Sequence, residues 1–238
     1  MNVLIACEES QAVCTEFRKL GHRAFSCDLQ ECSGGHTEWH IQGDVLPLLN
    51  GRCTFVTSDT HTHTQADRWD LIIAHPPCTY LSNAGACRMY RVIDGVQHII
   101  PERYKLMEEG RAFFFECMNA DCDRIAVENP LPMKICNLPQ PTQVIQPYDF
   151  GHPYSKRTLL WLKGLPPIMP TKYMDTWVTW LPSNTSLFAK GEGGSRGVAR
   201  DARSRSRTFQ GIAEAMAKQW SDYIIKGEIP EGGQYSLW

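Results

Sequence analysis

Short apolar runs alternate with amphipathic segments through the first half of the chain. Residues Val3–Cys7, Ala24–Cys27, Leu71–Ala74 and Arg124–Val127 are hydrophobic runs of strand length, and each ends in polar or rigid residues. Runs of this length between turn residues predict buried strands. Strands that alternate with helical segments indicate an α/β fold with a mostly parallel sheet and helices on both faces.

The segments between these runs have helical spacing. Val13, Phe17 and Leu20 recur at i, i+4 and i+7, with Ser10 as the expected N-cap and Gly21 as the expected stop. Two further helices are predicted at Pro101–Met118, with Tyr104, Met107, Phe114 and Met118 on its buried side, and at Phe209–Tyr223, with Phe209, Ile212, Met216, Trp220 and Tyr223.

Two other segments are predicted to be extended. Polar and β-branched residues alternate between Arg52 and Gln65 around Ser58-Asp59, which predicts a β-hairpin. An apolar run at Leu159–Leu162 has the length of a further buried strand. The polypeptide therefore contains enough strands for one large sheet.

Composition limits the class of protein. The 238 residues are 42% apolar and 21% charged, as in a soluble globular protein, and we expect a single domain over residues 1–238. No run approaches membrane-span length, and the first residues are too acidic for a signal peptide. The ten cysteines are irregularly spaced, which indicates reduced thiols in a cytoplasmic protein. With a net charge of −2, any nucleic-acid contact must come from a local patch.

Cysteine and histidine residues come close together in one early segment. Cys27, Cys32, His36 and His40 lie within a short stretch, but they lack the two tight pairs typical of zinc ligands. We therefore expect no metal site.

Chemically useful residues follow two of the predicted strands. His75-Pro76-Pro77-Cys78 closes the first of these runs, and Glu128-Asn129-Pro130 closes the second. In an open parallel sheet, ligands bind at the carboxyl ends of the strands, so the Cys78 thiol and the Glu128 carboxyl group should meet at one edge. They would form a nucleophile–acid pair. The alternatives are a buried structural thiol and a carboxylate that caps or solvates a strand end.

The order of these signals resembles the cytosine-C5 DNA methyltransferases. The matching segments are Leu4–Ser10, Asp28, Gly43-Asp44-Val45, Pro76-Pro77-Cys78, Glu128-Asn129-Pro130, Ser155-Lys156-Arg157-Thr158 and Phe209-Gln210-Gly211-Ile212-Ala213. The resemblance implies a Rossmann-like fold that uses S-adenosylmethionine and transfers a methyl group to C5 of cytosine in DNA.

The resemblance also implies catalytic roles. Cys78 would add to C6 of the base as a thiolate, and Glu128 would act as the acid beside N3. Arg157 would contact the base carbonyl or supply positive charge near the thiolate. Because a free thiol has a pKa near ~8.5, we expect the surroundings of Cys78 to favour its anion.

The cofactor contacts implied by the resemblance lie at the ends of the first strands. Asp28 would bind the ribose hydroxyls, and Asp44 with Val45 would contact adenine. The remaining expected contacts are Cys7, Glu8, Ser10 and Pro76. Each of the acids and Ser10 could instead be a helix cap. The first loop, Ala6–Ser10, has no glycine, unlike the family's glycine-rich turn.

The interval that carries the family's sequence-reading region is short in this chain. We predict a reduced recognition region at residues 165–208, including a basic loop at Lys190–Arg207. Base contacts specify a DNA site, whereas phosphate contacts only position the protein. The expected substrate is therefore duplex DNA with relaxed or short-site specificity, DNA recognised through a partner protein, single-stranded DNA or a cytosine nucleotide.

Three other functions remain open on the sequence. One is C5 modification of a free deoxycytidine nucleotide, with methyl or another group. A second is an exocyclic amino methyltransferase, although those enzymes place an aromatic residue directly after Pro-Pro, where this chain has Cys78, with Tyr80 two residues further on. A third is a non-catalytic nucleic-acid-binding relative whose first loop no longer holds the cofactor.

Overall fold

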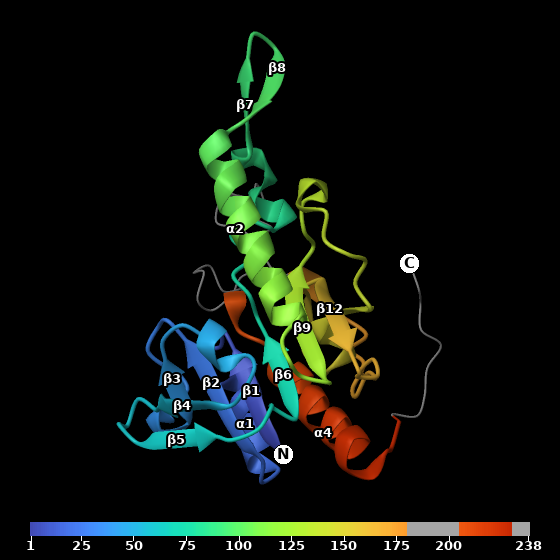
Figure 1. Ribbon diagram of the computed structural model, residues 1–238. Coiled ribbons are helices and arrows are strands. Elements are labelled where there is room, and N and C mark those ends of the chain that lie inside the picture. Colours follow the sequence, from blue (N-terminus) through green and yellow to red (C-terminus); the bar gives the residue numbers. More distant parts are fainter. Residues whose placement is uncertain (180–204, 230–238) are drawn as a thin grey trace.

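A seven-stranded sheet forms the centre of the protein (Figure 1). The computed structural model describes residues 1–179 and 205–229. In spatial order the strands are β3, β2, β1, β6, β9, β12 and β10. Their bounds are β1 Asn2–Ala6, β2 Arg23–Asp28, β3 His40–Gln42, β6 Leu71–Ala74, β9 Ile125–Pro130, β10 Gln143–Ile145 and β12 Thr158–Lys163.

The sheet is mostly parallel, as predicted. Strands β3, β2, β1, β6 and β9 pair in parallel, whereas β12 is antiparallel to both of its neighbours, β9 and β10. If the seven strands are numbered along the chain, their order is 3-2-1-4-5-7-6. This is the doubly wound order with one reversed strand inserted before the last, so the α/β prediction is confirmed.

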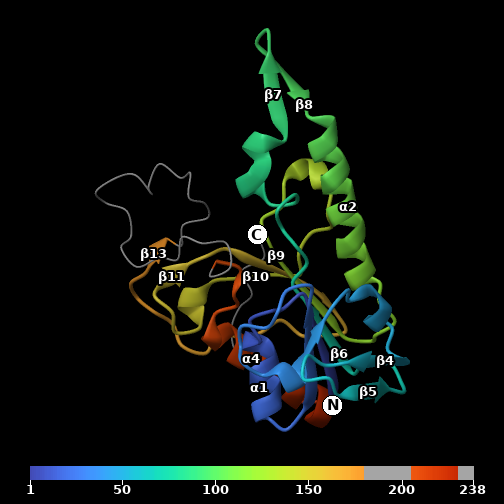
Figure 2. The same cartoon turned by 90° about the vertical axis from the view of Figure 1, so that its left-hand side faces the viewer.

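Helices cover both faces of this sheet (Figures 1 and 2). Helices α1 (Ala12–Lys19) and α4 (Gln210–Lys226) lie on one face, and α2 (Pro101–Met118) lies on the other. Successive residues of a strand point to opposite faces. Val3 and Ile5 of β1 accordingly share a core with Phe17 and Trp220, whereas Leu4 shares the opposite core with Phe114. Burial on both faces explains why β1 is apolar throughout.

Within the described residues, three two-stranded sheets accompany the central one. Strands β4 (Cys53–Val56) and β5 (Thr62–Gln65) form the hairpin predicted between Arg52 and Gln65. A second hairpin, β7 (Tyr90–Ile93) and β8 (Val96–Ile99), projects from the body at the start of α2 (Figures 1 and 2). Strands β11 (Tyr154–Ser155) and β13 (Val178–Thr179) form the third. Short 3-10 turns occur at Thr37–Trp39, Leu46–Leu48, Asn83–Arg88, Lys134–Cys136 and Pro147–Asp149.

Helix α1 does not begin with the predicted serine cap. Its N-cap is Gln11, which has a φ of 57° and makes no side-chain cap. The carboxylate of Glu8 instead accepts hydrogen bonds from the backbone N–H groups of Val13 at 2.6 Å and Cys14 at 3.2 Å. The cap prediction for Ser10 is therefore wrong, because a residue further upstream reaches over the first turn with its longer side chain.

The buried side of α2 differs from the prediction at one position. Met107 and Phe114 are fully buried, and Met118 packs against the same core. Tyr104 is 39% exposed, so its placement on the buried side is wrong. The first turns of α2 extend beyond the central sheet, so the sheet does not cover them (Figure 1).

Part of the predicted recognition region lies outside the described residues. Of residues 165–208, the structure describes 165–179 and 205–208; Arg196, Arg200 and Arg203 of the basic loop lie outside it. The prediction of a single domain over residues 1–238 therefore stays a prediction. In the part of the chain that is described, no helix has both the length and the apolar character needed to cross a membrane.

Candidate active site

The strand order reverses between the neighbouring strands β1 and β6. From β1 the chain passes through α1 to β2, on one side, and from β6 it passes through α2 to β9, on the other side. At such a switch point the loops after the two strands diverge and leave a crevice at their carboxyl ends. The backbone N–H of His75, directly after β6, donates to the carbonyl of Ala6 at 2.9 Å and ties the two strand ends together.

A histidine and a glutamate form an ion pair beside this crevice. Because β6 and β9 are parallel, with Ala74 opposite Val127, the next residues of both strands lie side by side. The Nδ1 atom of His75 lies 3.1 Å from Oε2 of Glu128, and their side chains are only 10% and 15% exposed. No role is predicted for His75 from the sequence.

Each member of the pair favours the charged form of the other. Burial by itself lowers the pKa of His75, but the hydrogen bond and charge of Glu128 outweigh it and raise the pKa overall. Burial raises the pKa of Glu128, but the hydrogen bond and charge of His75, with the charge of Lys156, lower it overall. Both shifts favour an imidazolium paired with a carboxylate. The buried Nε2 atom of His75 has no hydrogen-bond partner among the described residues.

The loops that carry these groups are held together by an amide. The Nδ2 atom of Asn129, which is 1% exposed, donates to the carbonyl of Pro76 at 3.0 Å. The carbonyl of Cys78 accepts from the N–H groups of Leu81 at 3.1 Å and Ser82 at 2.8 Å, which closes a turn after the thiol. Glu128 and Cys78 are thus fixed at the carboxyl ends of neighbouring strands.

The surroundings of Cys78 do not favour its anion. Burial and then the charge of Glu128 raise the pKa of the Cys78 thiol, and they outweigh the opposing charges of Lys156 and Arg205. The expectation of a resting thiolate is therefore wrong for the protein alone. The raised pKa of Cys78 and the lowered pKa of Glu128 favour a neutral thiol and an ionised carboxylate.

Lys156 exerts the larger of the two opposing positive charges on Cys78. Its Nζ donates to the carbonyl of Arg205 at 2.8 Å. Burial lowers its pKa overall, although the charges of Glu128 and Cys78 act in the opposite direction. Arg157, the residue chosen from the sequence, is exposed in the link between β11 and β12. Its catalytic role stays a prediction. The local sequence Ser155–Thr158 does not indicate which of its two basic residues faces inward, because that depends on how β12 pairs in the sheet.

Several of the expected cofactor residues meet at the ends of the first three strands. Cys7 has a φ of 60°, a left-handed conformation that suits glycine. Burial raises the pKa of its thiol well above the ordinary value, and Cys117, Asp28, Cys27 and Asp44 raise it further. The charges of Asp28 and Asp44 therefore both influence the Cys7 thiol, directly after β1.

The expected cofactor contacts differ in how many hydrogen bonds they already make within the protein. Asp28 accepts from the N–H of Gln30 at 2.9 Å with one oxygen, and Asp44 accepts from that of Leu46 at 3.0 Å with one oxygen. Val45 is buried. Glu8, in contrast, uses both carboxylate oxygens on α1, so in this structure it caps a helix.

The donor set fits S-adenosylmethionine in its chemistry. Two carboxylates, Asp28 and Asp44, lie at the ends of β2 and β3, where carboxylates of such folds bind ribose hydroxyls. The left-handed turn at Cys7 gives the backbone a glycine-like path despite the absence of glycine. Negative charge around the turn suits a ligand that carries a sulfonium and an ammonium group.

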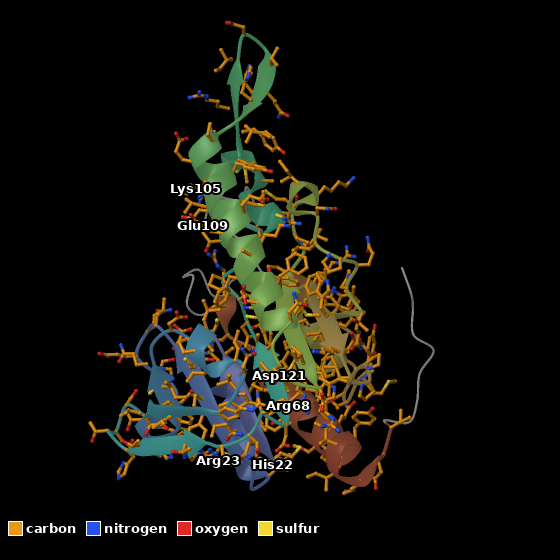
Figure 3. All side chains as sticks on the ribbon, in the orientation of Figure 1. His22, Arg23, Arg68, Lys105, Glu109 and Asp121 are labelled. Carbon is orange, nitrogen blue, oxygen red and sulfur yellow. The ribbon has the colours of Figure 1, made fainter. Side chains whose placement is uncertain are left out.

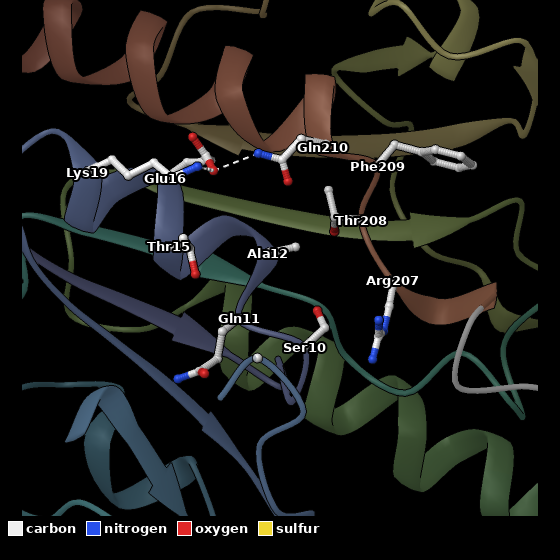
Figure 4. Close-up of a pocket in the computed structure, with 11 residues that line it drawn as sticks. Ser10, Gln11, Ala12, Thr15, Glu16, Lys19, Arg207, Thr208, Phe209 and Gln210 are labelled. Carbon is white, nitrogen blue, oxygen red and sulfur yellow. Dashed lines mark hydrogen bonds and ion pairs between the residues drawn. The ribbon is translucent and has the colours of Figure 1, made fainter. Parts of the chain in front are cut away.

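A cavity of about 440 Å³ opens next to this crevice (Figure 4). It lies between the start of α1, with Ser10 and Gln11, and the start of α4, with Phe209 and Gln210. The guanidinium of Arg207, on its rim, donates to the hydroxyl of Ser33 at 2.8 Å. Among the expected cofactor contacts only Ser10 lines this cavity, and Cys78 and Glu128 do not. It is therefore not the reaction centre.

A metal site needs several ligand side chains that lie close together. No three His, Cys, Asp or Glu side chains within residues 1–179 and 205–229 come together in a suitable group. All ten cysteines are free thiols.

Comparisons with known proteins give little beyond the structure itself. No family model matches the chain, and no curated protein matches it. Among solved structures, it is similar to a protein of E. coli described provisionally as a DNA modification methyltransferase encoded within a prophage, with 15% identity and a TM-score of 0.43. The match covers 79% of this chain and 55% of that one, so this chain spans little more than half of its length. The function must therefore be inferred from the residues of the site.

Proposed function

We propose that the protein is an S-adenosylmethionine-dependent methyltransferase that acts on C5 of cytosine in DNA. One observation carries this proposal: a thiol, a carboxylate, an imidazolium and an ammonium group come together at the carboxyl ends of β6 and β9. They belong to Cys78, Glu128, His75 and Lys156. A reducing compartment such as the cytoplasm suits a chain whose ten cysteines are all free.

The chemistry explains why a thiol is needed. C5 of cytosine is a poor nucleophile because the ring is aromatic and electron-poor. When Sγ of Cys78 bonds to C6, the C5–C6 electrons shift toward N3, and C5 becomes an enamine-like carbon once N3 is protonated. Covalent addition thus divides one difficult step into easier ones.

The ion pair accounts for the proton that N3 requires. Glu128, beside N3, passes it a proton that the imidazolium of His75 supplies, and the proton lost by the Cys78 thiol returns to the pair. The net change is one proton moved from sulfur to N3 and one S–C6 bond formed. Glu128 therefore does not need to be protonated at rest, since the pair already holds a proton. Lys156 stabilises the charge that develops on sulfur.

S-adenosylmethionine, when bound, supplies an electrophilic methyl group for C5. We assign its contacts to Asp28, Asp44, Val45 and the backbone at Cys7, with Pro76 at the border between cofactor and base. Loss of the C5 proton to water then restores the C5–C6 double bond and expels Cys78 as a thiolate. The proton on N3 returns to that sulfur through the ion pair, and the site is restored.

An exocyclic amino methyltransferase is less well supported by the surroundings of Tyr80. Such an enzyme needs an aromatic residue free to stack on the base. The ring of Tyr80 lies under the guanidinium of Arg103, with 4.5 Å from Cζ to the ring centroid. Tyr80 is thus engaged with α2.

The proposed reaction is tested by following labelled methyl groups from S-adenosylmethionine into three substrates: duplex DNA, single-stranded DNA and deoxycytidine monophosphate. We expect 5-methylcytosine in DNA with the native protein and none with Cys78→Ser. Labelling of the nucleotide alone would establish the free-nucleotide reaction instead, and N4-methylcytosine that survives Cys78→Ser would establish the amino methyltransferase. Absence of calorimetric binding of S-adenosylmethionine would favour the non-catalytic relative.

A further inference from the structure

The hairpin of β7 and β8 projects from the body (Figures 1 and 2). It belongs to the segment between β6 and α2 that also contains Cys78. Helix α2 begins directly after it, at Pro101, and leads back toward the sheet. The residues of the hairpin are exposed apart from Tyr90, which is half-buried. We call residues 90–99 the arm.

The register of the two strands determines which side chains share each face of the arm. Arg91 lies opposite His98, and Ile93 lies opposite Val96, on one face. On the other face, Tyr90 lies opposite Ile99, and Val92 lies opposite Gln97. A hairpin that packs on a core has one apolar and one polar face. Both faces of the arm combine hydrogen-bonding and apolar side chains, which suits a partner that encloses it from two sides.

The base of the arm is fixed relative to the thiol. Tyr80, two residues after Cys78, stacks under Arg103 in the first turn of α2. Leu81 is fully buried, and the N–H of Asn83 donates to the carbonyl of Leu131 at 2.8 Å, beyond the end of β9. The arm therefore stands at a defined position relative to the active site.

The dimensions of the arm match those of a DNA groove. Four residues per strand at about 3.3 Å each give a length of about 13 Å, and paired strands lie about 4.8 Å apart. The major groove of B-DNA is about 12 Å wide and about 8.5 Å deep and admits a two-stranded ribbon. The tip, Asp94-Gly95, has φ values of 49° and 76°, which are those of a tight two-residue turn. The end of the arm is consequently narrow.

The side chains of the arm suit base edges. Arginine recognises guanine, and glutamine recognises adenine, each with two hydrogen bonds, while apolar groups contact the thymine methyl. An acidic side chain accepts from the amino group of cytosine, so Asp94 at the tip also has a partner in the groove. Arg91 and Asp94 balance each other within the arm, and Arg88, directly before it, adds one positive charge at its base in a chain of net charge −2.

We infer that the arm enters the major groove of duplex DNA beside the target cytosine and contacts base edges there. This inference rests on the proposed function and adds to it the part of the protein that reads the duplex. It places recognition in the segment that follows Cys78, before α2, rather than in residues 165–208.

The test compares Arg91→Ala with a control, Lys105→Ala, for methyl transfer to a duplex and to the single strand of the same sequence. Lys105 is exposed on α2 below the arm and pairs with Glu109 at 3.9 Å, so its removal also deletes one cation (Figure 3). We expect Arg91→Ala to lower kcat/KM on the duplex about tenfold or more and to leave the single strand unchanged, because lost base contacts affect only the duplex. Lys105→Ala should change neither.

Binding of a fluorescent duplex, measured by anisotropy, tests the arm even if no methyl transfer occurs. A weaker complex with Arg91→Ala than with Lys105→Ala supports the inference, and the salt dependence should stay the same because no phosphate contact is lost. Equal affinity of both variants, or equal losses on duplex and single strand, would overturn it. So would a dimer in sedimentation experiments without DNA that the double variant Ile93→Ser and Val96→Ser dissociates, since the arm would then bind a second copy of the chain.

Discussion

The Nδ1 atom of His75 lies 3.1 Å from the Oε2 atom of Glu128, and both side chains are almost fully buried. Each stabilises the charged form of the other, which favours a proton on the imidazole and a negative charge on the carboxylate. In the proposed reaction, the acid is therefore a pair of residues. This arrangement has consequences for activity, pH dependence and stability.

Replacement of His75 should slow methyl transfer and change its pH profile. With His75→Asn, Glu128 no longer has an imidazolium to supply a proton, and we expect a loss of about 100-fold in kcat/KM at pH 7. In the native protein kcat/KM should fall as the pH rises through the raised pKa of His75, whereas the variant should lack that decrease. A pH series of methyl transfer measures both effects.

His22 provides the matched control for this substitution. It is another buried histidine, whose Nε2 lies 2.8 Å from Oγ of Ser221 at the opposite end of the sheet (Figures 1 and 3). His22→Asn should cost stability without altering the pH profile of kcat/KM. Identical pH profiles for the native protein and His75→Asn would show that the imidazolium takes no part in the reaction.

The ion pair should also stabilise the fold within a defined pH window. The raised pKa of His75 contributes stability below about pH 6.5 that is lost as the pH rises through the folded value. The lowered pKa of Glu128 contributes stability above about pH 4.5 that is lost as the pH falls through its folded value. Both contributions are present between these two values.

Glu128→Gln should therefore reduce the free energy of unfolding most strongly near pH 5.5. A loss of about 3 kcal/mol is expected there, because one partner of a buried pair is left uncompensated. The difference from the native protein should shrink at alkaline pH, as the pH rises through the raised pKa of His75. Denaturant unfolding over a pH series measures this, and a difference that does not vary with pH would argue against the ion pair.

Lys156, rather than Arg157, should control the reactivity of Cys78. Lys156→Met removes the cation that lowers the pKa of the thiol, so the pKa should rise further. Alkylation of Cys78 by iodoacetamide at pH 8, followed on its peptide by mass spectrometry, should slow several-fold. Arg157→Met, an exposed change one residue away, should leave the rate unaltered. Slowing by the Arg157 variant alone would restore the sequence-based choice.

The left-handed backbone of Cys7 should discriminate between two small replacements. Cys7→Gly and Cys7→Ala both remove the sulfur, but only glycine adopts a φ of 60° without steric cost. We expect the glycine variant to be more stable than the alanine variant by about 1 kcal/mol in denaturant unfolding. An alanine variant of equal or greater stability would show that this turn relaxes to another conformation.

The sequence predicts the inner strands of the central sheet because they are buried on both faces, whereas the short, partly exposed edge strand β10 is not predicted. Leu71–Ala74 is apolar at every position, and its rigid Pro-Pro exit marks its end. Parallel strands place their exits at one edge, so the proximity of Cys78 and Glu128 follows from the order of elements alone. The hairpin of β7 and β8 was missed, although Asp94-Gly95 between β-branched residues is a recognised hairpin signal.

Other parts of the site depend on three-dimensional relations that no local pattern contains. His75 gains its role from the register of β6 against β9, which puts it beside Glu128. The choice between Lys156 and Arg157 depends on which side of a short link faces the core. The ionisation of Cys78 depends on the balance of burial and three neighbouring charges, and composition gives no estimate of that balance.

The central claim is that sulfur from Cys78 bonds to C6 of cytosine. Its most direct test is incubation with S-adenosylmethionine and an oligonucleotide that carries 5-fluorocytosine at the target position, because fluorine at C5 prevents the final elimination. Mass spectrometry of the digested complex should find the methylated nucleotide attached to the peptide that contains Cys78, and the Cys78→Ser variant should give no adduct. An adduct on a different cysteine, or methyl transfer to cytosine without any adduct, would contradict the account.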